Sequence, residues 1–204
     1  MIVLAWGAVG AVAGIGVRWG SVRLARLEKL EPGNARWQAY GPPILAAVLF
    51  AVFAFRFAGS MPLLALDSVF VLVLVQVIFF DLEHRLILDR VILPSMAVAL
   101  AVSLFRQPWW AGIASGLGAG LLFVVIGLMG WALLKAEALG FGDAKFAAFM
   151  GLLLGPLPTI EALFAGVVLA GMFATIYAIW HRSMAGSIAL GPFLAVGTLL
   201  ILGS

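Results

Sequence analysis

Apolar residues dominate this sequence in long stretches, and short polar connections separate one stretch from the next. A helix that crosses a membrane needs about 20 mostly apolar residues. Eight stretches approach this length, and they cover residues 1–18, 40–57, 62–81, 88–105, 110–134, 144–155, 160–180 and 186–203. The pattern therefore predicts an all-α, polytopic integral membrane protein with about eight transmembrane helices.

The sixth stretch, residues 144–155, is the shortest, because Gly155 and Pro156 end it early. We expect a short helix there that starts inside the membrane region. The eight stretches leave no room for a soluble domain, so residues 1–204 are expected to form a single membrane-embedded domain. Residues 18–40 are expected to be a short cytoplasmic loop within it.

The composition excludes a soluble protein. Of the 204 residues, 65% are hydrophobic and 10% are charged, whereas soluble proteins carry about 25% charged residues. Soluble two-domain enzymes, disordered tails and nucleic-acid binders are therefore excluded. The chain has no cysteine, so it has neither disulfides nor a thiolate metal site. No basic residue precedes the first apolar stretch, which favours a retained span over a cleaved signal peptide.

Lysine and arginine residues are distributed unevenly between alternate connections. Connections on the cytoplasmic side of a membrane protein carry more of these residues. The first, third, fifth and seventh connections hold ten of the 12 basic residues, among them Arg23, Arg85, Lys135 and Arg182. The remaining two lie in the second and fourth connections. The bias predicts that the odd-numbered connections face the cytoplasm and that both chain ends lie outside.

Four of the nine acidic residues gather on the predicted cytoplasmic side: Asp81, Glu83, Asp89 and Asp143. An ionised carboxylate within a bilayer costs at least about 2.5 kcal/mol, so carboxylates at its boundary need an explanation. The other five acidic residues have simpler ones. A structural hydrogen bond is expected for Asp67, and solvated positions are expected for Glu28, Glu31, Glu137 and Glu161.

Asp81 and Asp143 stand at the two most informative places. Asp81 ends the charge-free run of residues 68–80, where the third span leaves the hydrocarbon, and Asp143 begins the sixth helix directly after Gly140 and Gly142. Two neighbouring carboxylates that share a proton are the catalytic groups of aspartic proteases. Spacing alone does not place the two aspartates side by side. Helix capping and interfacial solvation are the alternative explanation.

Three segments resemble type IV prepilin peptidases. GFGDAKFAAFMG is similar to the GxGD motif of this family, with Lys145 and Gly151 at matching positions. DLEHRLILDRVILP looks like the family's other aspartate segment, and IALGPFLAVG is similar to its glycine-proline segment. The matching residues in these two are Asp81, Glu83, His84, Leu86, Asp89, Leu93, Pro94, Gly191, Pro192 and Phe193.

The resemblance implies a membrane aspartic endopeptidase that removes the basic leader from prepilins or pseudopilins at the cytoplasmic face of the plasma membrane. It implies Asp81 and Asp143 as the catalytic pair. The supporting motif residues are Gly140, Gly142, Lys145, Glu83, His84 and Asp89. The expected partners are the prepilin and the lipid bilayer; no cofactor, metal or nucleic acid is expected, and the oligomeric state stays open.

Three departures from the family pattern matter. Leu88 stands where a proline is usual, so position 88 is expected to be helical, which would shift Asp89. Residues 17–40 lack the cysteine pairs of the family's zinc domain, and Trp37–Leu45 lacks the glutamate found in many members. These last two losses fall in the region associated with methylation of the cleaved pilin. We therefore expect peptidase activity without N-methyltransferase activity.

Two other functions remain open from the residues. A presenilin-type GxGD intramembrane protease would use the same aspartates deeper in the hydrocarbon, and a small transporter would use them with Asp67 as a proton relay. Single roles are also open. Glu83, Asp89 and Glu137 either attract the basic leader or are solvated, and Lys145 pairs with a carboxylate or a lipid phosphate. His84 is an interfacial histidine, tunes Asp81, or binds a metal with Glu83 and Asp89.

Overall fold

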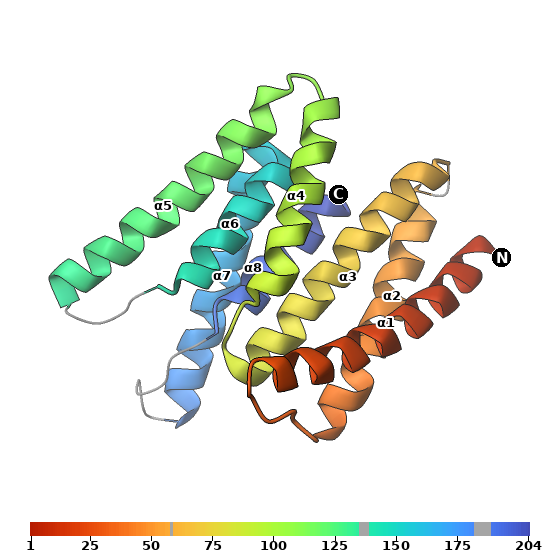
Figure 1. Cartoon of the computed structure of the whole chain (residues 1–204), viewed down its shortest axis with the longest axis horizontal. Helices are drawn as coiled ribbons and strands as arrows, with labels where there is room; N and C mark the ends of the chain where they lie inside the picture. The colour runs from red at the N-terminus through yellow and green to blue at the C-terminus, as the bar shows by residue number, and fades with distance from the viewer. Residues whose placement is uncertain (58, 135–138, 182–188) are drawn as a thin grey trace. The chain divides into compact units, whose positions relative to one another are not determined.

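The computed structural model describes residues 1–57, 59–134, 139–181 and 189–204, which form eight α-helices and no strand (Figure 1). The prediction of an all-α protein is thus confirmed for the described residues. The helices are α1 (Ile2–Leu27), α2 (Arg36–Phe57), α3 (Met61–His84), α4 (Asp89–Phe105), α5 (Trp110–Leu134), α6 (Phe141–Leu154), α7 (Pro156–His181) and α8 (Gly191–Leu202).

Within the described residues, five helices are long and apolar enough to cross a membrane: α1, α2, α3, α5 and α7. The other three are shorter, with 17 residues in α4, 14 in α6 and 12 in α8. A rise of about 1.5 Å per residue gives them about 18–26 Å, less than the roughly 30 Å hydrocarbon core. The chain is therefore a polytopic helical membrane protein, while the count of eight full spans stays a prediction.

The connection between the first two helices is shorter than expected. Helix α1 continues to Leu27 and α2 already begins at Arg36, so only residues 28–35 of the expected loop 18–40 are outside a helix. The end of an apolar run marks where a helix leaves the hydrocarbon, but the helix itself continues through good helix formers. Residues 18–27 include arginine, leucine and alanine, which have high helix propensity.

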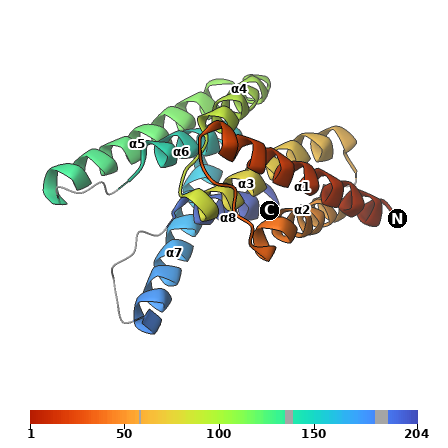
Figure 2. The same cartoon turned by 60° about the horizontal axis from the view of Figure 1, so that its bottom comes forward.

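The contacts divide the chain into two compact units, Met1–Arg85 and Leu86–Leu202, and each is described by itself. In the first unit α1, α2 and α3 pack on one another, and α1 runs beside α2 in both views (Figures 1 and 2). A Cβ atom on Gly10 would lie 2.6 Å from the carbonyl oxygen of Ala46, and one on Gly14 would lie 2.5 Å from Pro43 Cα. Glycine at these two positions lets α1 and α2 approach to backbone contact.

In the second unit α6 is the central helix, because it contacts α4, α5, α7 and α8. Its fully buried side chains include Phe146, Ala147, Phe149, Met150 and Leu153. A Cβ atom on Gly151 would lie 2.5 Å from Gly116 Cα in α5. Gly151 and Gly116 thus let α6 and α5 pack at backbone contact.

Helix α6 ends where the sequence predicts. Gly155, the residue after its last turn, has a φ of 82°, a left-handed conformation that favours glycine, and Pro156 begins α7. The shortness of α6 therefore follows from the sequence itself. Only 14 residues separate the start of α6 from the turn at Gly155.

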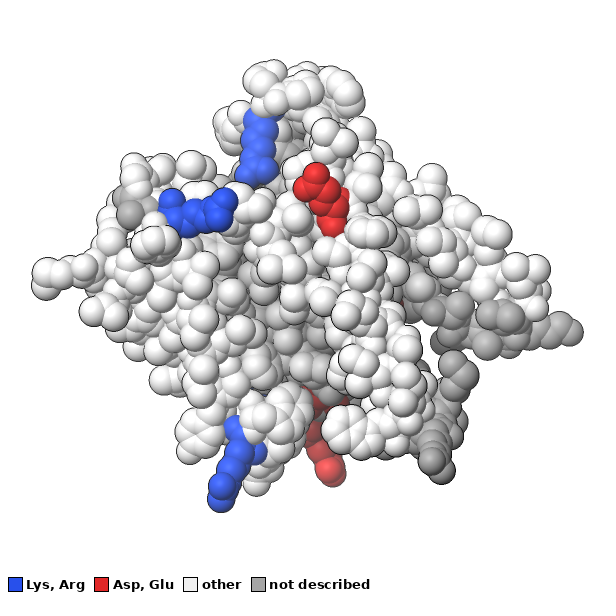
Figure 3. Space-filling model, turned by 180° about the vertical axis from the view of Figure 1, so that it is seen from behind, with Lys and Arg blue, Asp and Glu red and all other residues white. Residues whose placement is uncertain are grey.

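Charged side chains are few on the face drawn in Figure 3, and uncharged side chains make up most of it. Large apolar side chains are exposed on the long helices, including Ile15 on α1, Phe55 on α2, Leu133 on α5 and Ile179 on α7. Lipid tails solvate such a surface, whereas water does not. The exposed surface thus agrees with a membrane environment.

Candidate active site

Asp81 lies in the last turn of α3 and is buried, with 5% of its surface exposed. The helix ends three residues later, where Arg85 adopts a left-handed conformation (φ 53°, ψ 40°) and donates its backbone N–H to the carbonyl oxygen of Asp81 at 2.8 Å. This arrangement closes the helix within one turn of the aspartate. The sequence prediction that Asp81 stands at the end of the third helix is confirmed.

Glu83, two residues further, is held by groups from α1 and from the connection that follows α1. Its Oε1 accepts a hydrogen bond from the backbone N–H of Gly33, and its Oε2 lies 3.6 Å from Arg18 Nη1. Arg18 also donates to the carbonyl oxygen of Gly33. The Glu83 side chain is only 6% exposed. Neither expected role, a solvated charge or an attractor of the leader, agrees with this burial, because the carboxylate is already paired inside the first unit.

His84 packs its ring against Phe80, with the ring centroids 4.7 Å apart. Its Nε2 lies 3.2 Å from Glu83 Oε1, although the angles at this contact do not make it a hydrogen bond. In the described part of the chain, no three histidine, aspartate or glutamate side chains cluster as a metal site would require. His84 therefore belongs to the same cluster as Glu83.

Asp143 lies in the first turn of α6, as the sequence predicts. Its backbone N–H donates to the carbonyl oxygen of Gly140 at 3.1 Å, and a Cβ atom on Gly140 would lie 3.6 Å from Asp143 Oδ2. Asp143 lies outside the five long apolar helices. Burial raises the pKa of its carboxyl group, and the backbone hydrogen bond with Gly140 lowers the pKa by less.

Gly142 sets the distance between the start of α6 and the segment before α4. A Cβ atom on Gly142 would lie 3.1 Å from Ile87 Cβ, which is tighter than ordinary contact. Leu88, next to Ile87, is extended (φ −74°, ψ 122°) and caps α4, which begins at Asp89. The expectation that position 88 is helical is therefore wrong. The φ of −74° is one that proline also adopts, so the backbone at position 88 has the conformation that the family's usual proline would allow.

Lys145 forms an ion pair with Asp89, with Nζ 2.6 Å from Oδ1 and 2.8 Å from Oδ2. The pair joins the first residue of α4 to the second turn of α6. Both side chains are open to solvent, with 38% of Lys145 and 54% of Asp89 exposed. Of the two roles expected for Lys145, the structure shows the pairing with a carboxylate.

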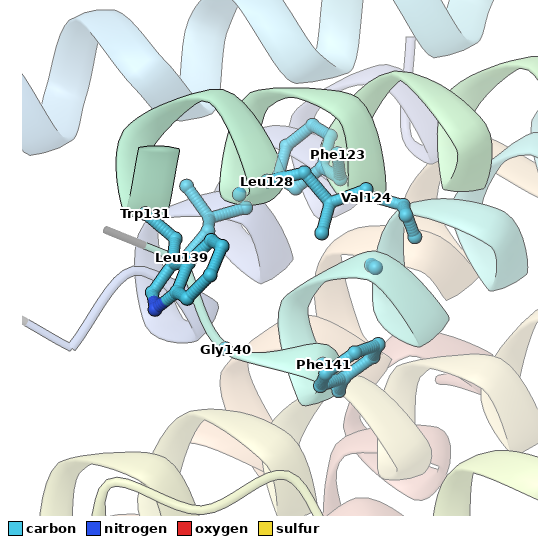
Figure 4. Close-up of a pocket in the computed structure, with 9 residues that line it drawn as sticks. Phe123, Val124, Leu128, Trp131, Leu139, Gly140 and Phe141 are labelled. Carbon is cyan, nitrogen blue, oxygen red and sulfur yellow. The ribbon is translucent and has the colours of Figure 1, made fainter. Parts of the chain in front are cut away.

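An apolar pocket of about 190 Å³ lies between α5 and the start of α6 (Figure 4). Phe123, Leu128 and Trp131 line it from α5, and Gly140 and Phe141 line it from the α6 side. The pocket is thus formed by the same glycine-containing turn that carries Asp143. A side chain without charge would fit such a lining, because it leaves no polar group without a partner.

The predicted site residues thus form two groups, one in each unit. Asp81, Glu83 and His84 belong to the first unit; Gly140, Gly142, Asp143, Lys145 and Asp89 belong to the second. The pairing of Asp81 with Asp143 stays a prediction. The first group contains the buried carboxyl group of Asp81, and the second contains the half-buried carboxyl group of Asp143. Hydrogen bonds at a helix end fix the backbone of each aspartate, and general acid–base chemistry requires groups that are held in position. Glu137, and Lys135 and Arg182 of the charge count, lie outside the described residues.

Sequence reasoning missed Arg18, Gly33 and Gln76. Arg18 was counted only as a topological charge, although it is the first basic residue after the opening apolar run. Gln76 is an amide within the apolar run that ends at Asp81, and it donates a hydrogen bond to Ser21 Oγ at 2.9 Å. A lone amide in a transmembrane helix usually bonds to a neighbouring helix, so Gln76 was the signal for the contact between α1 and α3.

Comparison with known proteins gives one family and one similar protein. Residues 68–177 match the model of the type IV leader peptidase family, and this range includes both Asp81 and Asp143. A prepilin leader peptidase/N-methyltransferase of Bacillus subtilis (strain 168) is 29% identical over 161 residues. The alignment covers 77% of this chain and 62% of the Bacillus protein, so the chain spans less than two thirds of that relative's length. No solved structure matches the chain.

Proposed function

Since the chain belongs to the type IV leader peptidase family, we propose that it is a membrane aspartic endopeptidase that removes the basic leader of prepilins or pseudopilins. The observation that carries this proposal is the family match itself, because residues 68–177 contain both aspartate segments. The similarity to the Bacillus prepilin leader peptidase supports the same substrate class. The distribution of basic residues supports cleavage at the cytoplasmic face.

The proposed catalytic groups are the carboxyl groups of Asp81 and Asp143, acting as a pair that shares one proton. The ionised carboxylate takes a proton from a water molecule, and the oxygen of that water attacks the scissile carbonyl carbon. The protonated partner donates to the carbonyl oxygen. As the tetrahedral diol collapses and the C–N bond breaks, the protonated carboxyl group gives its proton to the leaving amine. The ionised carboxylate takes the proton of one diol hydroxyl, so the carbonyl reforms as the carboxylic acid product and the pair again shares one proton. Water activation by two carboxyl groups needs no metal ion.

The turn around Asp143 supports the approach of a peptide. Gly140 has no side chain beside the Asp143 carboxylate, so a substrate backbone can come close to that carboxylate, whereas Ile87 occupies the space beside Gly142. The apolar pocket beside this turn offers a lining for the uncharged residues that follow the leader in a prepilin. The apolar helix of the prepilin would then lie in the bilayer beside the enzyme.

Co-expression with a candidate prepilin, followed by the mass of the pilin N-terminus, tests this function. The expected product lacks the leader and carries no added methyl group. Asp81→Asn and Asp143→Asn are each expected to lower the cleavage rate by at least about 10²-fold, the usual range for a general acid or base. Glu161→Gln, an exposed acidic residue outside the motifs, is the matched control and should cleave at the normal rate.

Four results would contradict these expectations. If prepilin stays uncleaved in the presence of the normal enzyme, the proposed peptidase function is wrong. Loss of cleavage in Asp89→Asn as complete as in Asp81→Asn would mean that the catalytic pair is misassigned. Loss of cleavage in EDTA, restored by one divalent cation, would replace the carboxyl pair by a metal site. A methylated product would show that a transferase site exists without the cysteine-containing domain.

The orientation has its own test. Reporter fusions at Arg23 and Arg85 are expected to report the cytoplasm, and a fusion after Ser204 is expected to report the outside. A C-terminal reporter inside the cell would mean an odd number of full spans, and one of the short helices α4, α6 and α8 would be the candidate that does not cross.

A further inference from the structure

The last turn of α3 is tied to the connection between α1 and α2 by a closed set of polar contacts. Glu83 accepts the backbone N–H of Gly33, Arg18 donates to the carbonyl oxygen of the same glycine, and Arg18 Nη1 lies 3.6 Å from Glu83 Oε2. Three separate parts of the first unit therefore meet at Gly33: α1 through Arg18, the connection 28–35, and α3 through Glu83.

The Gly33 side of this contact is itself fixed. The backbone N–H of Ala35 donates to Gln38 Oε1 at 2.7 Å, which is how a residue in the first turn caps the start of its own helix, here α2. Gln38 is buried, and a Cβ atom on Gly33 would collide with its side-chain amide. The position of Gly33 thus depends on α2 as well as on α1.

The contacts matter for Asp81 because of where they attach. Successive helical residues are turned by about 100°, so Glu83 points about 200° away from Asp81 and acts on it through the backbone. Helix ends fray unless their last groups are held. Glu83 is the second-last residue of α3, so its side chain holds the one turn that would otherwise fray.

Resting on the proposed function, we propose that Arg18 and Glu83 are positioning residues, which hold the last turn of α3 and with it the Asp81 carboxyl group. They do not touch the substrate. They keep the carboxyl group at the distance and angle that acid–base catalysis needs. Their loss should therefore lower kcat and leave KM nearly unchanged, because substrate binding does not involve them.

Steady-state cleavage of a prepilin by full-length variants tests the proposal. We expect Glu83→Ala to lower kcat about 30-fold, and Arg18→Met and Gly33→Ala about 10-fold each, with KM within about twofold. Gly33→Ala acts from the connection without altering α3. The double variant Arg18→Met/Glu83→Ala should be no slower than Glu83→Ala, since both changes break one contact set.

Conservative variants provide the rescue. Glu83→Gln keeps an oxygen that accepts from Gly33 and should retain kcat within about fivefold, and Arg18→Lys should lie within about threefold of the normal enzyme. Arg26→Met and Glu31→Gln are matched controls, because both side chains are exposed on the same connection and helix and should leave kcat unchanged. Loss of kcat in these controls equal to the loss in Glu83→Ala would overturn the proposal.

A second measurement does not depend on activity. The chain has no cysteine, so spin labels at Glu31→Cys and Leu82→Cys, both exposed, report only the separation of the connection from the last turn of α3. The distance distribution should be narrow and should broaden in Glu83→Ala. An unchanged distribution, or an unchanged kcat in a folded Glu83→Ala protein, would overturn the positioning role.

The two failures are distinguishable. If the normal enzyme cleaves no prepilin, the proposed peptidase function fails, and the spin-label distribution alone decides whether Arg18 and Glu83 hold the turn. If the normal enzyme cleaves prepilin and Glu83→Ala has the same kcat as the normal enzyme, the peptidase function stands and the positioning role is wrong.

Discussion

The two aspartate-bearing helix ends differ in how they are held. At the end of α3, Asp81 is buried and its neighbour Glu83 is paired with Arg18 and Gly33 inside the first unit. At the start of α6, Asp143 is half-buried, and its neighbour Lys145 pairs with Asp89 in solvent. Buried polar contacts thus hold the end of α3. Close packing, together with an exposed ion pair, holds the start of α6.

The helix dipole explains part of this difference. A carboxylate in the first turn of a helix faces the positive end of the dipole, whereas one in the last turn faces the negative end. Asp143 occupies the favourable end of its helix and Asp81 the unfavourable end of its own. The last turn of α3 therefore depends more on added contacts, and Arg18 and Gly33 supply them.

The largest effect is expected from the steric fit that holds α6. In Gly151→Ala the new Cβ atom meets the backbone of α5 at 2.5 Å, and we expect a loss of about 3 kcal/mol in the free energy of unfolding. Gly118→Ala is the matched control, since nothing lies within 4 Å of its Cβ position. Chemical denaturation in detergent measures both. An equal effect of the two substitutions would show that α5 and α6 are not in close contact.

The second-largest effect on the free energy of unfolding is expected from the ion pair of Arg18 and Glu83. Arg18→Met leaves the buried Glu83 carboxylate without its cation, which should cost about 2 kcal/mol of unfolding free energy. Arg26→Met, an exposed arginine of the same helix, should stay within about 0.5 kcal/mol of the normal protein. A loss in Arg18→Met no larger than in this control would mean that Arg18 and Glu83 contribute no more than surface charges.

The exposed ion pair should have a smaller effect. Because both side chains are exposed, Lys145→Met is expected to cost less than about 1 kcal/mol, and Asp89→Asn should keep measurable cleavage. Thermal unfolding and the cleavage rate check the two statements. A loss in Lys145→Met greater than in Arg18→Met would reverse the comparison between the two helix ends.

The smallest effect concerns pH. Burial raises the pKa of Asp143, so the folded protein binds this proton more tightly than the unfolded chain does. The normal protein should therefore lose stability relative to Asp143→Asn as the pH rises through the ordinary carboxyl range, and the difference should level off above the raised pKa. Unfolding curves of the two proteins at several pH values measure this. A difference that favours the normal protein as pH rises would contradict it.

The sequence was sufficient for several features that depend on local order. The apolar runs predicted helices, Gly155 and Pro156 predicted the end of α6, and Asp81 and Asp143 were placed correctly in their helical turns. Each of these follows from neighbouring residues: run length, the φ freedom of glycine, or the proline ring.

The contacts of the charged side chains could not be predicted from the residues next to them in the sequence. Gly33 and Glu83 are 50 residues apart, and nothing near either one indicates the other. The extension of α1 to Leu27 was missed because hydropathy marks the membrane, not the helix end. Leu88 was expected to be helical because the proline was absent, but packing of Ile87 against Gly142 accompanies an extended backbone there.

The central claim is that Asp81 and Asp143 act as one pair, and thiol cross-linking tests it most directly. Because the chain has no cysteine, Asp81→Cys/Asp143→Cys contains the only two thiols. The control Asp67→Cys/Asp143→Cys moves one thiol about 21 Å along α3, towards the start of that helix. A short thiol cross-linker should join the first pair and not the second. No cross-link in the first variant while both thiols still react with a monofunctional maleimide, or equal cross-linking in both variants, would contradict the claim.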